Sequence, residues 1–322
     1  MTRSNSSTTW LVGDIGGTNA RFGLVSPDGT LLHSRVLADA DYPSIAEAID
    51  AYLGDRGGLP RPRRGAIAIA SPVAGDEVRM TNHPWTFSIS GLRERLSFSR
   101  LAVINDFTAQ ALALPHLKEG DRTTVGGGKA LAGWPIGVLG PGSGLGVSGL
   151  VPSGRKWLPL SGEGGHSTMA PYTDRESAVL DVLRCHLDHV SAERVLSGPG
   201  VVNLYNALAE VDGVPARQYT AAQITDEATG KDDALCGEAT AMFCAMLGTV
   251  AGNLALTLGA KGGVYIAGGI VPRLGERFAA SQFRERFEAK GRFRDYLAAI
   301  PTYIVTHNLP AFLGCAAALM EK

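Results

Sequence analysis

Asn105 and Asp106 are the residues of this chain best placed to do chemistry, because they directly follow the apolar run 101–104. A short unbroken apolar run is typical of a strand buried on both faces, as in a parallel sheet. Ligands collect beyond the carboxyl ends of such strands, and a carboxylate held there could act as a general base. Residues at helical spacing follow until Pro115. On this segment alone, the simpler interpretation that Asp106 caps that helix is favoured.

Two glycine-rich segments, residues 13–21 and 140–149, each follow a predicted strand. Glycines let backbone N–H groups approach a phosphate without obstruction by side chains. A strand rather than a helix follows each segment, so neither is a P-loop, and the Gly-x-Gly-x-x-Gly pattern of residues 144–149 lacks the helix of a dinucleotide site. An ordinary hairpin is the alternative for the first segment, although Asp14 and Thr18 make it unusually polar. Two such turns facing across a cleft could hold a polyphosphate from both sides.

Glu163 and His166 lie in a further glycine-rich loop, residues 158–166. On a loop that allows close approach, these side chains suit the recognition of hydroxyl groups. A surface loop with incidental polar residues is a serious alternative for His166, and a metal site lacks further nearby ligands. Glu193 lies near the start of a helix that we expect to end at residues 198–200. From the residues alone, its interaction with the helix dipole is the favoured role.

Composition limits the classes of function. The chain has 322 residues, which predicts two domains. Thirty Lys and Arg against 31 Asp and Glu leave a net charge of −1, so no overall field attracts nucleic acid or an anionic membrane, although a local basic patch stays possible. No apolar run is expected to reach the length of a membrane span, because Gly, Pro or charge interrupts each one. The polar residues 1–9 predict a short disordered lead-in without a secretion signal, and the four cysteines are expected to be free thiols in the cytoplasm.

Strands and helices are predicted along the rest of the chain from the periodicity of its apolar residues. Residues 115–133 are rich in loop formers and predict a domain border. Strands are expected at residues 10–12, 22–25, 31–36, 66–70, 136–139, 262–270 and 303–305, with a hairpin and loop at 76–85. Helices are expected at residues 42–53, 92–96, 107–114, 174–189, 191–200, 201–208, 235–258, 274–290 and 310–320.

Taken together, these motifs resemble the bacterial glucokinases, in the hexokinase group of the actin-like ATPase superfamily. The motifs come in the family's order over nearly the whole chain, and they are residues 13–21, 104–107, 140–146, 162–166, 191–200 and 266–270. The loop 80–85 is also similar. The resemblance implies two actin-like (ribonuclease H-like) α/β domains with a cleft between them. The small domain would be residues 1–116 plus 308–322, and the large domain residues 117–307.

The resemblance also implies a reaction, the ATP-dependent phosphorylation of glucose at its 6-hydroxyl, in a cytoplasmic homodimer. Asp106 would be the catalytic base, and the sugar hydroxyls would be bound by Asn105, Asp106, Glu163, His166 and Glu193. Phosphates would be held by Gly13, Asp14, Ile15, Gly16, Gly17 and Thr18 in the first turn and by Gly140, Gly142, Ser143 and Gly144 in the second. Gly268 and Gly269 would border the adenosine. Asp14 would lie near Mg²⁺ and contact it through water.

One branch of similar sugar kinases carries a cysteine-rich zinc motif after its Gly-Glu-x-Gly-His segment. Here no cysteine follows His166 until Cys185, which argues against that branch. Two alternatives stay open. A non-catalytic sugar-sensing regulator would need a DNA-binding extension, and only about nine polar residues precede the first predicted strand. A kinase for another hexose, such as mannose or an N-acetylated amino sugar, would differ only in the shape of its pocket.

Overall fold

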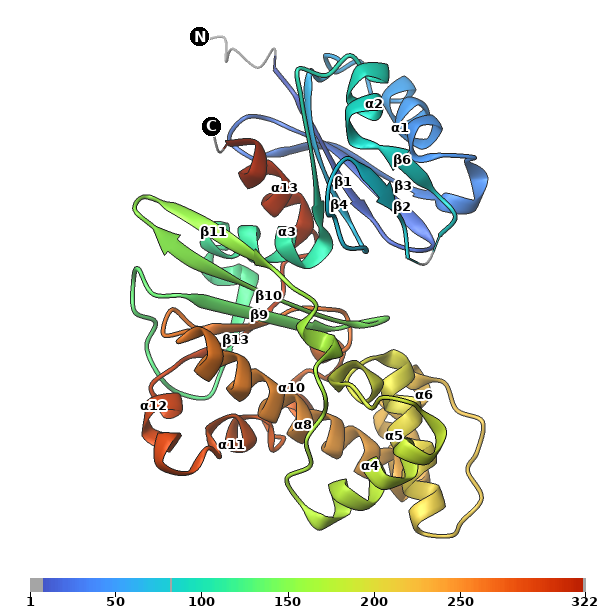
Figure 1. Ribbon diagram of the computed structural model, residues 1–322, viewed down its shortest axis with the longest axis vertical. Coiled ribbons are helices and arrows are strands. Elements are labelled where there is room, and N and C mark those ends of the chain that lie inside the picture. The colour runs from blue at the N-terminus through green and yellow to red at the C-terminus, as the bar shows by residue number, and fades with distance from the viewer. Residues whose placement is uncertain (1–7, 82, 321–322) are drawn as a thin grey trace. The chain divides into compact units, whose positions relative to one another are not determined.

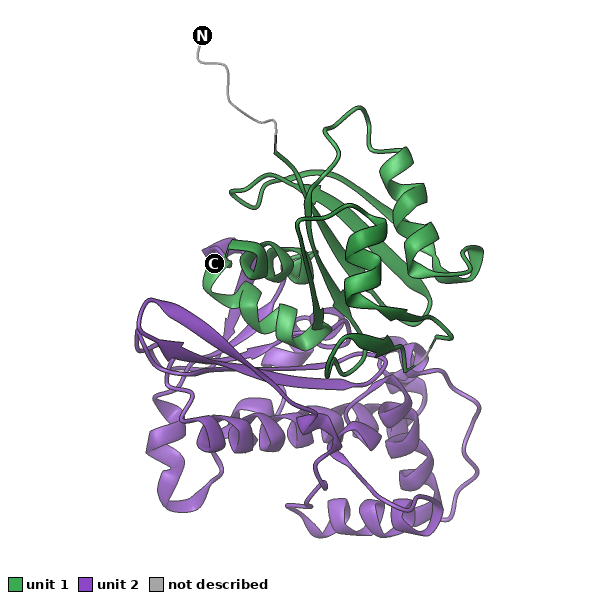
Figure 2. Cartoon of the chain, turned by 45° about the horizontal axis from the view of Figure 1, so that its top comes forward, with its two compact units in different colours: residues 1–117, 307–322 green, residues 118–306 purple. Residues whose placement is uncertain are grey.

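The chain folds into two compact α/β units in a computed structural model, of which residues 8–81 and 83–320 are described. Unit 1 consists of residues 1–117 and 307–322, and unit 2 of residues 118–306 (Figure 2). The predicted lead-in falls largely on residues 1–7, which lie outside the described residues, as does Asn82 of the loop 80–85. The predicted mixed α/β fold is confirmed in each unit.

The first unit is built on a five-stranded sheet in the order β3-β2-β1-β4-β7. β1 lies antiparallel to β2 and parallel to β4, and β4 lies parallel to β7. All of these strands were predicted near their observed bounds, which are β1 (Trp10–Ile15), β2 (Asn19–Val25), β3 (Leu31–Ala38), β4 (Arg64–Ile69) and β7 (Arg100–Asn105). A separate hairpin pairs β5 (Glu77–Arg79) with β6 (Thr86–Ser88).

Helices cover both faces of this sheet, as Figure 1 shows. One face packs against α1 (Ile45–Gly54) and α2 (Ile89–Arg95), and the other against α3 (Asp106–Ala113) and α13 (Pro310–Met320). Because successive strand residues point to opposite faces, Leu11 belongs to the first core and Val12 to the second. A methyl group at Gly314 would overlap the carbonyl of Ala109, so α13 and α3 pack with their backbones close together.

β7 differs from the strand that the sequence predicts. It forms the edge of the sheet, and only Val103 among its residues is fully buried. The expectation of a strand buried on both faces is therefore wrong. An edge strand has a neighbour on one side only, so its apolar run is covered by α3 and α13 on one face and by α2 on the other without being enclosed.

Unit 2 is built on a six-stranded sheet in the order β11-β10-β9-β12-β13-β8. Its first five strands repeat the order and directions of unit 1: two antiparallel pairs, then two parallel ones. The bounds are β8 (Arg122–Val125), β9 (Ile136–Pro141), β10 (Leu145–Ser153), β11 (Lys156–Ser161), β12 (Val264–Ile266) and β13 (Thr302–Val305). The edge strand β8 lies in residues 115–133, where the sequence predicts loop, because its four residues show little apolar pattern.

The helices of unit 2 gather mainly around the long helix α8 (Ala234–Leu258), which contacts both α5 (Gly198–Val211) and α11 (Phe283–Glu288). α4 (Asp174–His186) packs in turn on α5. The smaller helices are α6 (Ala221–Ile224), α7 (Glu227–Asp232), α9 (Val271–Leu274), α10 (Glu276–Ala279) and α12 (Arg294–Ala298). Two predictions are wrong here. Residues 274–290 form short pieces interrupted by turns, and α5 begins at Gly198, where a helix was expected to end, because Ser197 accepts the Gly200 N–H as an N-cap.

The helix α8 is long and apolar enough, by length and composition, to cross a membrane. The expectation that no segment reaches that length is therefore wrong for residues 234–258. Its glycines explain the packing that it makes instead: a methyl group at Gly248 would overlap the carbonyl of Phe283, and one at Gly252 would lie 2.5 Å from the carbonyl of Phe287. The most apolar window of α8 is 61% buried inside the structure, as in a core helix.

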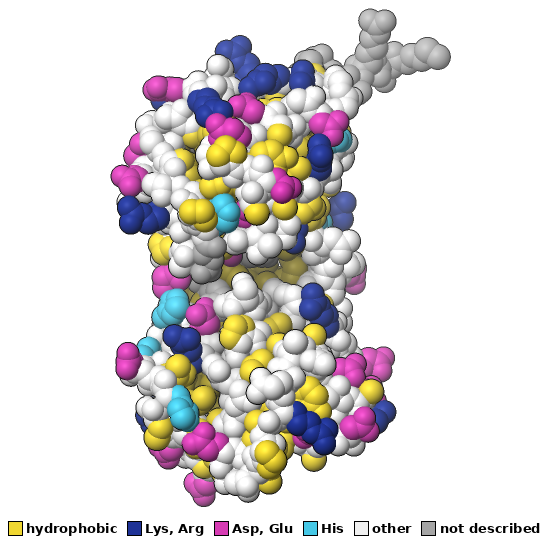
Figure 3. Space-filling view, turned by 90° about the vertical axis from the view of Figure 1, so that its right-hand side faces the viewer, with side chains coloured by type: hydrophobic (Ala, Val, Ile, Leu, Met, Phe, Trp, Pro, Cys, Tyr) yellow, Lys and Arg dark blue, Asp and Glu magenta, His cyan; other side chains and the backbone are white. Residues whose placement is uncertain are grey.

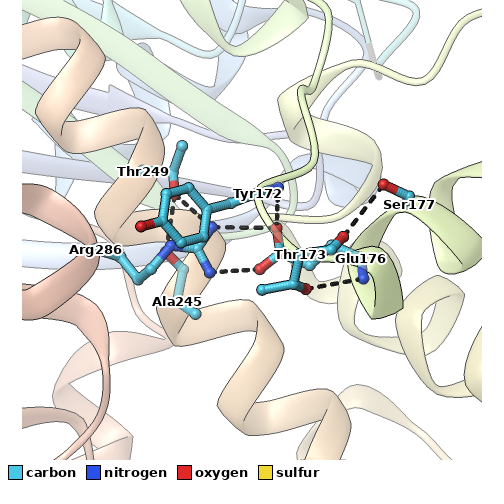
Figure 4. Close-up of polar contacts among 7 residues, drawn as sticks. All are labelled: Tyr172, Thr173, Glu176, Ser177, Ala245, Thr249 and Arg286. Atoms are coloured by element: carbon cyan, nitrogen blue, oxygen red, sulfur yellow. Dashed lines mark hydrogen bonds and ion pairs between the residues drawn. The ribbon is translucent and has the colours of Figure 1, made fainter. Parts of the chain in front are cut away.

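A buried ion pair joins three of these helices (Figure 4). The guanidinium of Arg286 on α11 donates to both carboxylate oxygens of Glu176 on α4, at 2.5 and 3.1 Å, and to Thr249 on α8 at 2.9 Å. The ring of Tyr172 covers the guanidinium with its centroid 4.1 Å away. At the surface, in contrast, Lys, Arg, Asp and Glu are interspersed over the face in Figure 3.

Candidate active site

In unit 1 the carboxyl ends of the parallel strands β1, β4 and β7 lie at the same end of the sheet. Ile15 is in register with Ile69, and Ile69 with Asn105. The backbone N–H of Ala70, just beyond β4, donates to the carbonyl of Ile15 at 3.1 Å. The first glycine turn and Asp106 therefore follow strands two positions apart, a separation of roughly 10 Å at the usual strand spacing. The first glycine turn and Asp106, both singled out from the sequence, therefore lie at the same end of the sheet.

Asn105, rather than Asp106, is the N-cap of α3. Its Oδ1 accepts the N–H groups of Phe107 and Thr108 at 2.9 and 3.1 Å. Asp106 is the first residue of the helix, half-buried, and its Oδ1 also lies 2.9 Å from the Phe107 N–H. The capping role that the sequence alone favours for Asp106 thus belongs to its neighbour. α3 does not depend on the Asp106 carboxylate for its cap.

The first glycine turn, between β1 and β2, is closed by a hydrogen bond from the Gly16 N–H to the Asn19 carbonyl at 3.0 Å. Asp14 and Arg21 are cross-strand partners on either side of it. The Arg21 guanidinium lies 3.4 Å from the Asp14 carboxylate. Burial raises the pKa of Asp14, and the charge of Arg21 lowers it in part. A desolvated carboxylate beside a glycine turn would gain from a nearby cation.

The second glycine turn, between β9 and β10, is closed by a hydrogen bond from the Gly142 N–H to the Gly144 carbonyl at 2.8 Å. Gly268, beyond the end of β12, lies directly against it: its φ is +83°, and a methyl group there would overlap the carbonyl of Pro141. The Ala267 N–H also donates to Leu139 at 2.8 Å. The structure therefore brings the expected phosphate turn of unit 2 together with the segment that includes Gly268 and Gly269.

The three expected sugar ligands of unit 2 lie on neighbouring segments. Glu163 and His166 are exposed at either end of the short 3₁₀ helix η4 (Gly164–His166). Glu193 lies in a second one, η5 (Ala192–Arg194), which is linked to the first by a hydrogen bond from the Ala192 N–H to the Ser167 carbonyl at 2.8 Å. The Glu193 side chain accepts the Leu145 N–H at 2.8 Å. η5 is a single turn, which leaves little dipole for this carboxylate to stabilise.

Sequence reasoning missed several residues that support these groups. Ser71, beyond β4, presents its carbonyl 3.5 Å from the Asn105 amide nitrogen and its hydroxyl to Thr81. Ser197 donates to the Glu193 carbonyl at 2.8 Å. The position of Ser71 directly after the predicted strand 66–70 was a usable signal, because Asn105 directly follows the apolar run 101–104 in the same way. Ser197 had only its N-cap position before Gly198 and Pro199.

Solved structures with the same fold define the class of protein. A crystal structure of glucokinase from an Antarctic psychrotroph has a TM-score of 0.89 at 38% identity and covers 98% of this chain and 99% of that chain. A ROK family glucokinase from Streptomyces griseus, in complex with glucose and AMPPNP, has a TM-score of 0.64 at 20% identity, over 97% and 98% of the two chains. The second likeness is one of fold alone. The fold is that of the sugar kinases.

The family follows from the sequence. The Glucokinase family model matches residues 11–322. A curated glucokinase from Paramagnetospirillum magneticum is 55% identical over 307 residues, which are 95% of this chain and 96% of that protein. The chain therefore belongs to the glucokinase family, and its reaction is the ATP-dependent phosphorylation of glucose.

Proposed function

We propose that Asp106 is the general base of this reaction. It takes the proton of the glucose 6-hydroxyl as that oxygen forms its bond to the γ-phosphorus of ATP and the bond to ADP breaks, giving glucose 6-phosphate and ADP. The observation that supports the role is the shared end of the sheet: Asp106 follows β7, which is linked through β4 to β1, the strand that leads into the first glycine turn. A general base is typically worth about 10²–10⁴ in rate.

Asn105, Glu163, His166 and Glu193, together with Asp106, are proposed to bind the hydroxyl groups of the sugar. The exposure of Glu163 and His166 within unit 2 and their link to η5 support this assignment. A site built around hydroxyls rejects sugars that lack them, because its polar groups would then be left unpaired. The assignment draws on residues of both units, so kinetics must show whether they serve one substrate.

The two glycine turns are proposed to hold the phosphates of ATP, residues 13–18 in unit 1 and residues 140–144 in unit 2, with Gly268 and Gly269 beside the adenosine. The contact of Gly268 with Pro141 supports a common nucleotide site in unit 2. The repeated strand order of the two sheets supports the further proposal that the units are the two domains of an actin-like ATPase.

Asp14 fits a role beside Mg²⁺, which is proposed to be held through water. A hard cation prefers carboxylate oxygen. Burial already raises the pKa of Asp14, and the charge of Arg21 lowers it in part. When bound, Mg²⁺ would neutralise charge on the phosphate oxygens. Within the chain, Asp14 would orient the cation's water shell, while the backbone of residues 15–18 positions the phosphate.

The experiment that tests the function is a coupled assay of ADP release over a panel of hexoses. Glucose is expected to give the largest kcat/KM, and mannose and N-acetylated amino sugars are expected to give far less. ADP release that does not depend on any sugar would contradict the kinase assignment, and a preference for another hexose would correct the substrate. Sedimentation of the same preparation tests the proposal that the protein is a homodimer. Like its proposed location in the cytoplasm, the homodimer is inferred from the resemblance.

A further inference from the structure

The backbone of Leu145 connects the expected phosphate turn of unit 2 to both of the segments expected to bind sugar. Its N–H donates to Oε2 of Glu193 at 2.8 Å. Its carbonyl is covered by Gly165 of η4, where an added methyl group would overlap the Leu145 oxygen. Leu145 directly follows Gly144, the last residue of the turn. The position of the turn and the position of the two sugar segments therefore depend on the same peptide units.

Gly144 leaves the space that the Glu193 carboxylate occupies. A Cβ at residue 144 would lie 2.5 Å from Oε2 and 3.3 Å from Cδ of Glu193. The backbone at this residue is outside the left-handed region, so its conformation does not itself require glycine. Gly142 in the same turn has no atom of a described residue within 4 Å of the corresponding position. The need for glycine at residue 144 comes from the carboxylate beside it.

The segment that carries Glu193 has little freedom to move away from such a methyl group. Ser197, which is 2% exposed, donates to the Glu193 carbonyl at 2.8 Å and caps α5 by accepting the Gly200 N–H at 3.0 Å. The Gly198 N–H donates to the Gly142 carbonyl at 2.8 Å. At the other end of the segment 192–198, the Ala192 N–H donates to the Ser167 carbonyl at 2.8 Å. Both ends are thus held, and the side chain of Glu193 would have to rotate.

We infer that Gly144 is a positioning residue for the sugar, acting through Glu193, although it lies in the turn assigned to phosphate. It keeps the carboxylate where Oε2 meets the Leu145 N–H and Oε1 is presented to a sugar hydroxyl. Because Glu193 is held by the backbone next to the phosphate turn, the affinity for sugar is sensitive to the conformation of that turn. The inference rests on the proposed function, which assigns Glu193 to the sugar.

The test compares Gly144→Ala with Gly142→Ala, Glu193→Ala and the double variant Gly144→Ala/Glu193→Ala. Glucose affinity is measured by calorimetry without nucleotide, and KM is measured for each substrate. Gly144→Ala is expected to weaken the binding of glucose about tenfold or more. Gly142→Ala is expected to change the affinity and KM for glucose less than about twofold, and any effect that it has should be on the KM for ATP. In the Glu193→Ala background, Gly144→Ala is expected to weaken glucose binding no further, because the effects of substitutions at interacting residues are not additive.

A Gly144→Ala variant with normal glucose affinity, or one whose loss adds fully to that of Glu193→Ala, would overturn the inference. If Glu193→Ala itself leaves glucose affinity unchanged, the proposed sugar assignment of Glu193 fails, and the inference fails with it. If Glu193→Ala weakens glucose binding while Gly144→Ala does not, the inference about Gly144 fails and the proposed role of Glu193 stands. Should Gly144→Ala not fold, recovery of folding in the double variant supports the clash, and no recovery overturns it.

Discussion

Asp14 on β1 and Arg21 on β2 face each other across the ends of the first glycine turn, with 3.4 Å between carboxylate Oδ2 and guanidinium Nη1. Arg21 is the charge that partly offsets the effect of burial on the pKa of Asp14. The pair makes the ionisation of Asp14, and with it the proposed Mg²⁺ site, dependent on a neighbouring side chain.

Arg21→Gln is expected to raise the pKa of Asp14 further, because burial then acts without a nearby positive charge. A raised pKa keeps the carboxyl protonated to a higher pH, so the acidic limb of kcat/KM for ATP moves to higher pH. Added Mg²⁺ should oppose the shift, since it binds the ionised form. The matched control is Arg35→Gln on β3, which removes an exposed pair with Asp55 and should leave the profile in place. An unshifted limb in Arg21→Gln would contradict the coupling.

Asp106→Ala is expected to lower kcat by about 10²–10⁴ while glucose binding stays measurable, because a general base acts on the proton and other groups hold the ring. Asp106→Asn keeps the shape and should lose similar activity. Both variants should remain folded, since the N-cap of α3 is Asn105. Coupled turnover and calorimetric glucose binding give the two readouts, and turnover equal to that of the natural chain would rule out Asp106 as the base.

His166→Ala and Glu163→Gln are expected to raise the KM for glucose, roughly tenfold or more, with little change in the KM for ATP, because each removes a hydroxyl partner. His186→Ala serves as a control, since this exposed histidine pairs with Glu210 at the end of α4. Initial rates at varied glucose and fixed ATP measure the effect. An unaltered KM in both variants would place η4 outside the sugar site.

Asp39→Asn is expected to stabilise the protein at neutral pH. Asp39 is fully buried directly after β3, and neither of its carboxylate oxygens has a hydrogen-bond partner among the residues that the structure describes. Burial raises its pKa, and the charge of His83 lowers it in part. A raised acid pKa means that stability is lost as pH rises from the unfolded value near 3.8 through the folded one. The gain in Asp39→Asn should therefore appear above that window and vanish below it. Urea unfolding between pH 3 and 8 decides, and a loss of stability at pH 7 would contradict the argument.

Arg286→Ala is expected to destabilise unit 2 by about 3–5 kcal/mol, because it leaves the carboxylate of Glu176 buried without its partner. The double variant Glu176→Gln/Arg286→Met should recover most of that loss, since both charges are then absent. Arg184→Ala, which removes an exposed pair with Asp181, should cost under about 1 kcal/mol. Denaturant unfolding gives the three values, and equal losses in Arg286→Ala and the double variant would show that packing, not charge, is responsible.

The amino-acid sequence was sufficient to locate most strands and helices, because short apolar runs between glycine turns and helical periodicity are local signals. It placed Asp106 at a strand-to-helix junction and the two glycine turns between strands, and all three features are present. It also predicted α13 with its observed bounds. The family resemblance was also confirmed, because each of its motifs is a short continuous stretch that can be identified from the sequence alone.

Which residues become neighbours depends on how segments far apart in the chain pair and pack. The register of β1, β4 and β7 aligns Ile15 with Asn105 through Ile69, and this depends on pairing between strand residues 54 and 36 positions apart in the sequence. The capping role of Asn105 and the contact between Glu193 and Leu145 likewise depend on side-chain directions that no local pattern encodes. Periodicity reports which face of an element is buried, but the atoms that meet there are selected by packing between elements.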